Sequence, residues 1–237
     1  MAFLQPPASQ QPAFNVPTSV VLLLVLLIGV HGALALLPAA TADSIVAQYA
    51  FNPALYSSAF LDTHHIDGGA WWQRAIPFVS YIFLHADLMH LAINCLWLLA
   101  FGPVVARRFG GLRFLIFFLI CGICAAAFQM VCSWGSFAPI IGASGAVSGL
   151  MAAGIRMLPL QDNRISARFE KLMPIWSRQV LLFSIVWTLI NVVAGITGFA
   201  GVGTELRLIA WQAHIGGYVA GLFLSTLFDR RNEHAAA

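Results

Sequence analysis

The segment Pro139–Leu150 reads PIIGASGAVSGL and places Ser144 between Gly142 and Gly145, at the start of an apolar run. A serine is less favourable than a leucine inside an apolar segment that enters a membrane, so a polar group in such a place is a candidate functional residue. What Ser144 does therefore depends on which other polar groups lie at the same depth.

The composition indicates an integral membrane protein. Of the 237 residues, 60% are hydrophobic and only 9% are charged, whereas soluble domains carry about 25% charged residues. The net charge of +3 does not gather on any segment long enough to be a soluble domain. We therefore expect the lipid bilayer as partner and exclude a nucleic-acid partner.

Six apolar segments approach the length needed to cross a bilayer, which is about 20 helical residues. They predict an all-α, polytopic membrane protein with one six-helix domain over residues 18–228. The Pro- and Gln-rich residues 1–17 are expected to form a disordered tail, and residues 229–237 a second tail. The expected helices are residues 18–38, 86–106, 114–132, 144–158, 179–201 and 207–228.

Basic residues predict the orientation of these helices, because loops rich in Arg and Lys stay in the cytoplasm. Ten of the twelve Arg and Lys residues lie in the predicted loops on one side of the membrane, and only Arg74 and Arg207 lie on the other side. Six crossings with this distribution place both termini in the cytoplasm. The residues on the cytoplasmic side are Arg107, Arg108, Arg113, Arg156, Arg164, Arg168, Lys171, Arg178, Arg230 and Arg231.

Residues 43–85 form a long connection on the non-cytoplasmic side, and its many aromatic residues predict a position in the membrane interface. Just before it, Ala40, Thr41 and Ala42 resemble a signal-peptidase site. However, residues 1–17 contain no Lys or Arg, and the apolar run is longer than that of a usual signal peptide. We therefore expect the first helix to be retained.

Polar residues recur on two other predicted helices. The second contains HADLMHLAIN, residues 85–94, with His85, His90 and Asn94; His90 and Asn94 are four residues apart and share one helical face. The sixth contains WQAHIGGYVAGL, residues 211–222, with His214 in its outer part. These residues are candidates to accompany Ser144.

The glycines predict how the fourth and sixth helices meet. Gly145 and Gly149 on one, and Gly217 and Gly221 on the other, form two small-xxx-small faces that allow close backbone approach. Docking these faces brings the serine of one helix beside the histidine of the other. Ser144 is twelve helical residues, or about 18 Å, from Arg156 at the cytoplasmic boundary. Because the bilayer core is about 30 Å thick, Ser144 is expected well below the outer surface.

This arrangement predicts nucleophilic catalysis. Serine needs an adjacent base to attack at neutral pH, and histidine is the usual one, so Ser144 and His214 form a predicted catalytic dyad. Asn94, His90 and the backbone N–H of Ser144 are predicted donors to an oxyanion. No carboxylate lies near His214 in its helix; the nearest in sequence is Glu205.

The motifs GASG at 142–145, HADLMHLAIN at 85–94 and AHIGGYVAG at 213–221 resemble those of the rhomboid family of intramembrane serine proteases. The resemblance covers about residues 76–228. It implies Ser144 as nucleophile, His214 as base, and Asn94 and His90 at the oxyanion, supported by Gly142 and Gly145.

The same resemblance implies a bacterial-type multi-pass protein of the cell inner membrane that needs no metal or cofactor. It implies that the substrates are transmembrane segments of other proteins. His85 matches a family histidine with a role in a polar cavity. Ser148, one turn after Ser144, occupies the place where some members carry an aromatic residue that stacks on the histidine. The sequence does not indicate whether the protein is a monomer or an oligomer.

Two other enzyme classes fit the sequence less well. The seven histidines are too few and too scattered for a di-iron oxygenase, and HADLMH lacks the HExxH spacing of a zinc protease. The CGIC sequence at 121–124 lies in an apolar helix, where cysteines serve as small packing residues. A catalytically silent rhomboid relative that binds membrane clients remains the alternative function.

Overall fold

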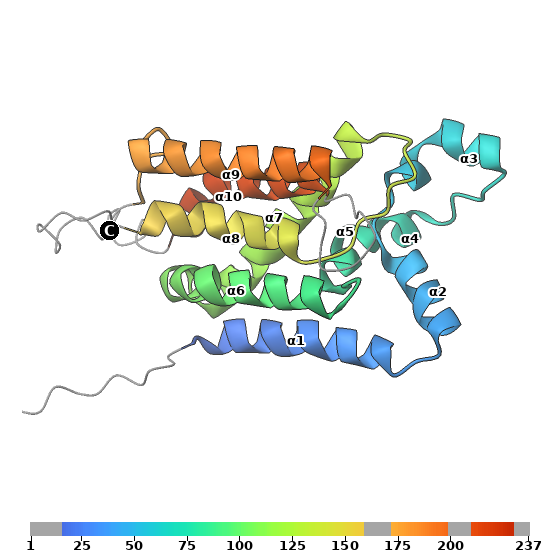
Figure 1. The fold of residues 1–237 in the computed structure, drawn as a ribbon, viewed down its shortest axis with the longest axis horizontal. Coiled ribbons are helices and arrows are strands. Elements are labelled where there is room, and N and C mark those ends of the chain that lie inside the picture. The colour runs from blue at the N-terminus through green and yellow to red at the C-terminus, as the bar shows by residue number, and fades with distance from the viewer. Residues whose placement is uncertain (1–15, 159–171, 199–209, 230–237) are drawn as a thin grey trace, which may run out of the picture.

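The computed structural model describes residues 16–158, 172–198 and 210–229, and within these ranges the chain is helical between its loops (Figure 1). The predicted all-α class is therefore confirmed. Each of the six predicted segments overlaps one long helix, although α6 ends three residues beyond its predicted end and α7 begins three residues before its predicted start. These helices are α1 (Thr18–Ala35), α6 (Leu88–Phe109), α7 (Gly111–Cys132), α8 (Ser144–Met157), α9 (Arg178–Thr197) and α10 (Trp211–Phe228).

Four of these helices, α1, α6, α7 and α9, are long and apolar enough to cross a membrane, as judged over the described residues. The chain is thus a multi-pass membrane protein. α8 has only 14 residues, and α10 begins with Trp211, Gln212 and His214, which lower its hydropathy. Crossing by α8 and α10 therefore stays a prediction. The two residues of the predicted catalytic dyad, Ser144 and His214, lie on these two helices.

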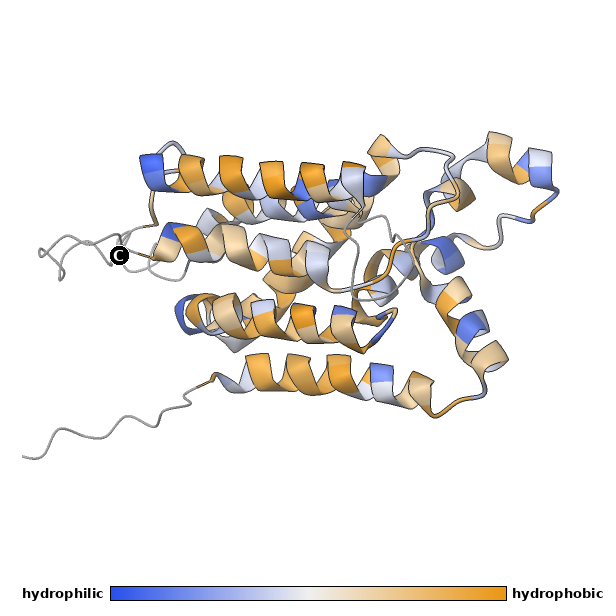
Figure 2. Ribbon diagram, in the orientation of Figure 1, coloured by the Kyte–Doolittle hydropathy of each residue, from blue (hydrophilic) through white to orange (hydrophobic). Residues whose placement is uncertain are grey.

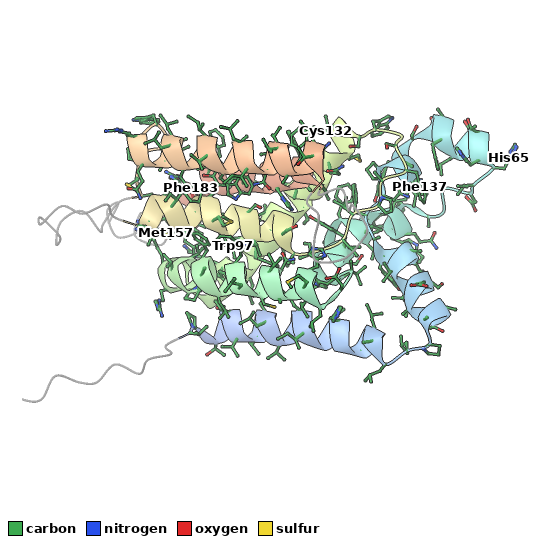
Figure 3. All side chains as sticks on the ribbon, in the orientation of Figure 1. His65, Trp97, Cys132, Phe137, Met157 and Phe183 are labelled. Atoms are coloured by element: carbon green, nitrogen blue, oxygen red, sulfur yellow. The ribbon has the colours of Figure 1, made fainter. Side chains whose placement is uncertain are left out.

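Short helices form the connection between α1 and α6. They gather at one end of the long-helix bundle (Figure 1), and Figure 3 shows His65 far from Met157 at the opposite end of α8. The first apolar segment ends as a helix at Ala35, because Pro38 disfavours helical backbone just before it and forms the N-cap of the next helix. The short helices are α2 (Ala39–Tyr49), η1 (Pro53–Tyr56), α3 (Ser58–His64), α4 (Trp71–Ala75), α5 (Pro77–Ser80) and η2 (Tyr81–Phe83).

The outer helices present apolar side chains outward. α9 buries only Val180 and Gly195, whereas large residues such as Leu182 and Ile190 are more than half exposed. α1 also exposes large apolar side chains. Figure 2 shows that apolar residues predominate in both helices. Such a surface is costly in water, so these faces are suited to lipid.

α8 is the central helix. All of its residues from Gly145 to Arg156 are buried, and it packs against α6, α7 and α10. A helix surrounded by protein can begin with polar groups inside the membrane, because those groups do not face lipid. The position of Ser144 at the start of α8 is therefore physically tolerable.

The glycine faces of α8 and α10 lie in direct backbone contact. A Cβ on Gly217 would collide with the carbonyl oxygen of Gly145, and one on Gly221 would collide with that of Gly149. A Cβ on Gly149 would lie 3.0 Å from the Gly217 oxygen. Only glycine permits this spacing, and small residues at helix interfaces serve the same purpose in membrane proteins generally.

Polar contacts hold the opposite end of the bundle together. The buried Arg156 guanidinium donates to the backbone oxygen of Leu222 and to Ser225 Oγ, both at 2.6 Å. Arg108 binds the Asp229 carboxylate through two N–H groups, at 3.0 and 2.6 Å. Donors at both carboxylate oxygens make this a strong type of ion pair. α8 and α10 are thus connected both at their glycines and at their C-terminal ends.

Of the two predicted tails, residues 1–17 and 229–237, only residues 16, 17 and 229 lie within the described ranges. Asp229, with which the predicted C-terminal tail begins, is buried and belongs to the packed bundle. The described start of α1 and the end of α10 lie at the same end of the molecule (Figure 1). The basic residues Arg164, Arg168, Lys171, Arg207, Arg230 and Arg231, and Glu205, also fall outside the described ranges.

Candidate active site

The loop before α8 is fixed by backbone contacts. Ile140 pairs with Phe51 in an isolated antiparallel bridge, and the Gly142 N–H donates to the Tyr81 carbonyl at 2.9 Å. Gly142 adopts φ +117°, a conformation that side-chain-bearing residues rarely adopt. α8 begins at Ser144, two residues after this glycine.

Ser144 and His214 lie in hydrogen-bonding contact. Ser144 Oγ is 2.7 Å from His214 Nε2, although 70 positions separate the two residues in the sequence. Both side chains are partly buried. α8 starts without a side-chain cap, so the N–H groups of its first turn remain available and carry the positive end of the helix dipole.

Asn191 of α9 contacts the other side of the histidine. Its Oδ1 lies 2.7 Å from His214 Nδ1, and its Nδ2 donates to the Trp187 carbonyl at 2.8 Å. Sequence reasoning did not single out this residue. The signal was a carboxamide inside an otherwise apolar helix, which is costly unless a specific partner satisfies it.

Gln129 of α7 supports the start of α10. Its Oε1 accepts a hydrogen bond from the backbone N–H of Ala213 at 3.2 Å, and its Nε2 donates to Ser133 Oγ at 3.0 Å. The side chain is buried. Gln129 thereby satisfies one of the unpaired N–H groups that begin a helix, directly beside His214. This residue was also missed in the sequence.

His90 and Asn94 lie across the site, beside Gly142. A Cβ on Gly142 would come within 2.6 Å of His90 Nε2 and within 3.9 Å of Asn94 Nδ2. The Asn94 amide donates one N–H to the His90 carbonyl at 2.8 Å, and it possesses a second N–H. The predicted donor face of α6 is thus adjacent to the turn that precedes Ser144.

His85 packs against His90. Its ring is buried and makes an edge contact with the His90 ring, with centroids 5.1 Å apart. α6 begins just after it, where Asp87 caps the helix by accepting from the His90 N–H at 2.8 Å. His85 therefore precedes α6, and the expectation that it lies on the second helix with His90 and Asn94 is wrong, because the helix begins only after Asp87. Its ring nevertheless packs against that of His90, and its role stays a prediction.

Ser148 cannot stack on the histidine as an aromatic residue at its position would, and it makes a hydrogen bond within its own helix instead. Its Oγ donates to the Ser144 carbonyl at 2.7 Å, within α8. The aromatic ring near the histidine comes instead from α9: the Trp187 and His214 centroids are 6.5 Å apart. Trp187 is itself stacked on Tyr218 of α10 at 4.6 Å.

A metal site would need several ligating side chains close together, and the residues that the structure describes do not provide one. Among them, no group of three or more His, Cys, Asp or Glu side chains lies close enough to hold a metal ion. All four cysteines are free, including the two of the CGIC sequence.

These observations define a helical multi-pass membrane protein with a Ser–His pair at the start of its central helix. The rhomboid domain model matches residues 68–231. The chain therefore belongs to the rhomboid family, and the resemblance seen in the three motifs is confirmed.

Two relatives illustrate the relationship. The chain is 31% identical over 155 residues to the rhomboid protease GluP of Bacillus subtilis (strain 168), which covers 65% of this chain and 25% of that protein. It is 27% identical over 154 residues to the rhomboid protease GlpG of Yersinia pestis (strain Pestoides F), covering 65% and 48%. The matched region thus spans half or less of each relative.

Proposed function

We propose that this chain is an intramembrane serine endopeptidase that cleaves transmembrane segments of other membrane proteins with a Ser–His dyad. The observation that carries the proposal is the 2.7 Å contact between Ser144 Oγ and His214 Nε2 at the partly buried start of α8. A nucleophile and base within hydrogen-bonding distance are the minimal requirement for such catalysis.

In the proposed reaction, His214 Nε2 takes the Ser144 proton as Oγ attacks the scissile carbonyl carbon. The carbonyl oxygen becomes an oxyanion, held by the first N–H groups of α8 and the donor face of α6. The protonated histidine then gives its proton to the departing amine, leaving an acyl-enzyme. Water, deprotonated by the same histidine, releases the acyl product and restores the serine.

The proposal includes six crossings of a bacterial inner membrane, with both termini in the cytoplasm. α8 and α10 would complete the crossings by packing within the other helices rather than by facing lipid. The cytoplasmic side corresponds to the end with Arg108 and Arg156, so Ser144 lies toward the opposite surface.

A catalytically silent client-binding relative is the second candidate function. Such a protein would retain the packed bundle without a need for the Ser144–His214 contact. The presence of that contact favours the protease.

Active-site labelling tests the proposed function directly. A fluorophosphonate should modify the purified wild-type protein on Ser144, identified by peptide mass spectrometry. The same preparation should cleave a transmembrane peptide in excess metal chelator. A protein that is folded but neither labels nor cleaves would favour the client-binding function.

For Asn94→Ala, we expect turnover to fall by roughly 10- to 1,000-fold, because removal of one oxyanion donor costs up to about 4 kcal/mol. KM should change little, since the bond strengthens mainly in the transition state. The measurements are kcat, KM and thermal stability, with neighbouring Cys95→Ala as control. Normal turnover, or a loss that only follows lost stability, would contradict the oxyanion role.

Orientation can be tested with tags. A tag inserted after residue 160 or fused to the C-terminus should be cytoplasmic, and one near residue 55 should be periplasmic, as expected from the basic residues. Protease protection in spheroplasts provides the readout. A mature protein that begins after Ala42 would instead show that the first helix is removed.

A further inference from the structure

We propose that Asn191 is a positioning residue that holds His214 in the tautomer able to accept the Ser144 proton. This inference rests on the proposed serine protease function and deepens it, since it extends the dyad to a Ser–His–Asn arrangement. It derives from the contacts at both nitrogens of one imidazole ring.

The amide orientation of Asn191 follows from its second contact. The Trp187 carbonyl, 2.8 Å away, can only accept a hydrogen bond, so the amide group facing it must be the NH2. Exchanging the amide oxygen and nitrogen would place two acceptors against each other. Asn191 therefore directs its oxygen at His214 Nδ1, 2.7 Å away.

This orientation determines the histidine tautomer. An amide oxygen has no proton to donate, so the proton between the two residues belongs to His214 Nδ1. In the neutral ring Nε2 then carries the lone pair. Of the two groups in the 2.7 Å contact at Nε2, the Ser144 hydroxyl must be the donor. This is the hydrogen-bond pattern that a general base requires.

The geometry also restricts the ring in space. His214 is held from α8 by Ser144 and from α9 by Asn191, while its own helix is fixed by Gln129 at Ala213. A neutral amide orients the ring without adding a buried negative charge, which would be costly at this depth. Asn191 thus supplies orientation and not charge.

Three variants separate this role from simple helix packing. Asn191→Leu keeps a similar shape but removes the acceptor. Asn191→Asp keeps an acceptor oxygen toward His214 and, as the neutral acid, an O–H donor toward the Trp187 carbonyl. Ser184→Ala is the matched control, because Ser184 Oγ lies 2.9 Å from Tyr218 Oη and connects the same two helices away from His214.

We expect Asn191→Leu to lower kcat by about 10- to 1,000-fold with little change in KM, less than the roughly 10⁴-fold loss caused by a wrong tautomer in soluble serine proteases. Asn191→Asp should recover much of this activity. Ser184→Ala should retain activity within a few-fold. All are compared at equal folded fraction, measured by thermal unfolding.

The tautomer provides a readout independent of activity. In protein labelled with ¹⁵N-histidine, the ¹⁵N shifts of His214, assigned by their absence in His214→Asn, should show a protonated Nδ1 and an unprotonated Nε2. In Asn191→Leu the ring should lose this preference and show averaged shifts.

The outcomes distinguish the two proposals. A proton on Nε2 in the wild type, or normal kcat in folded Asn191→Leu, would overturn the Asn191 role and leave the protease intact. An Asp variant as inactive as the Leu variant at equal stability, or an equal loss in Ser184→Ala, would also overturn it. A wild type that neither labels nor cleaves would remove the protease proposal itself.

Discussion

Ser144→Ala is expected to abolish peptide cleavage, with kcat falling by on the order of 10⁵- to 10⁶-fold. The reason is that the proposed reaction needs Oγ to form a covalent bond to the scissile carbon, and no other hydroxyl replaces it. Ser148 Oγ, the nearest serine hydroxyl along α8, is bonded to the Ser144 carbonyl. The measurement is product formation from a transmembrane peptide in detergent or liposomes.

The variant should remain folded, because Ser144 is only partly buried and the change removes a single hydrogen bond, the one between its hydroxyl and His214. Ser148→Ala, on the same helix, is the matched control and should stay active within a few-fold. Fluorophosphonate labelling should disappear in Ser144→Ala alone. Cleavage by that variant at a rate near the wild type would exclude Ser144 as the nucleophile.

Gly217→Ala is expected to destabilise the protein by about 3 kcal/mol, at the upper end of the usual cost of overpacking. The added methyl group would collide with the backbone of Gly145, and backbone atoms cannot rotate away as a side chain can. α8 and α10 must move apart, which also separates Ser144 from His214. We therefore expect loss of thermal stability together with loss of cleavage.

Gly29→Ala is the control for this prediction. Gly29 lies in α1, and a Cβ added there meets no atom within 4 Å. This change should be neutral or slightly stabilising, because alanine is the better helix former. Thermal unfolding of both variants in the same detergent provides the comparison. Equal stability of the two variants would contradict the close α8–α10 contact.

The sequence predicted the long helices well, because their apolar runs end at strong local signals. α6 ends at Phe109, before Gly110 with φ +84°, and α9 begins after Ser177, whose Oγ accepts from Val180 N–H. The first segment was predicted three residues too long, because the helix ends before Pro38, and the second three residues too short, because its helix continues to Phe109. Local backbone chemistry accounts for all three boundaries.

The approach of Ser144 to His214 was also predictable, although 70 positions separate them. The two glycine pairs specify both the contacting faces and their register, because only there can two backbones touch. The roles of both residues remain proposals, as do those of His90 and Asn94. Their positions on one face of α6 follow from helical periodicity alone.

Asn191 and Gln129 could not be assigned from sequence, because nothing local specifies their partners. Asn191 acts across the gap between α9 and α10, and Gln129 between α7 and α10. Close glycine contacts also exist there, at Gly216 of α10 against α7 and at Gly195 of α9 against Trp211, but they do not indicate which polar side chain meets His214 or Ala213.

By itself the sequence determined a helical membrane protein, its long helices and the pairing of α8 with α10, since hydrophobic length, glycine spacing and capping act over short distances along the chain. Only the tertiary structure decided which polar side chain meets His214 Nδ1 and what holds the start of α10. Those contacts depend on how each helix is rotated about its axis, which is set by the packing of all the helices together.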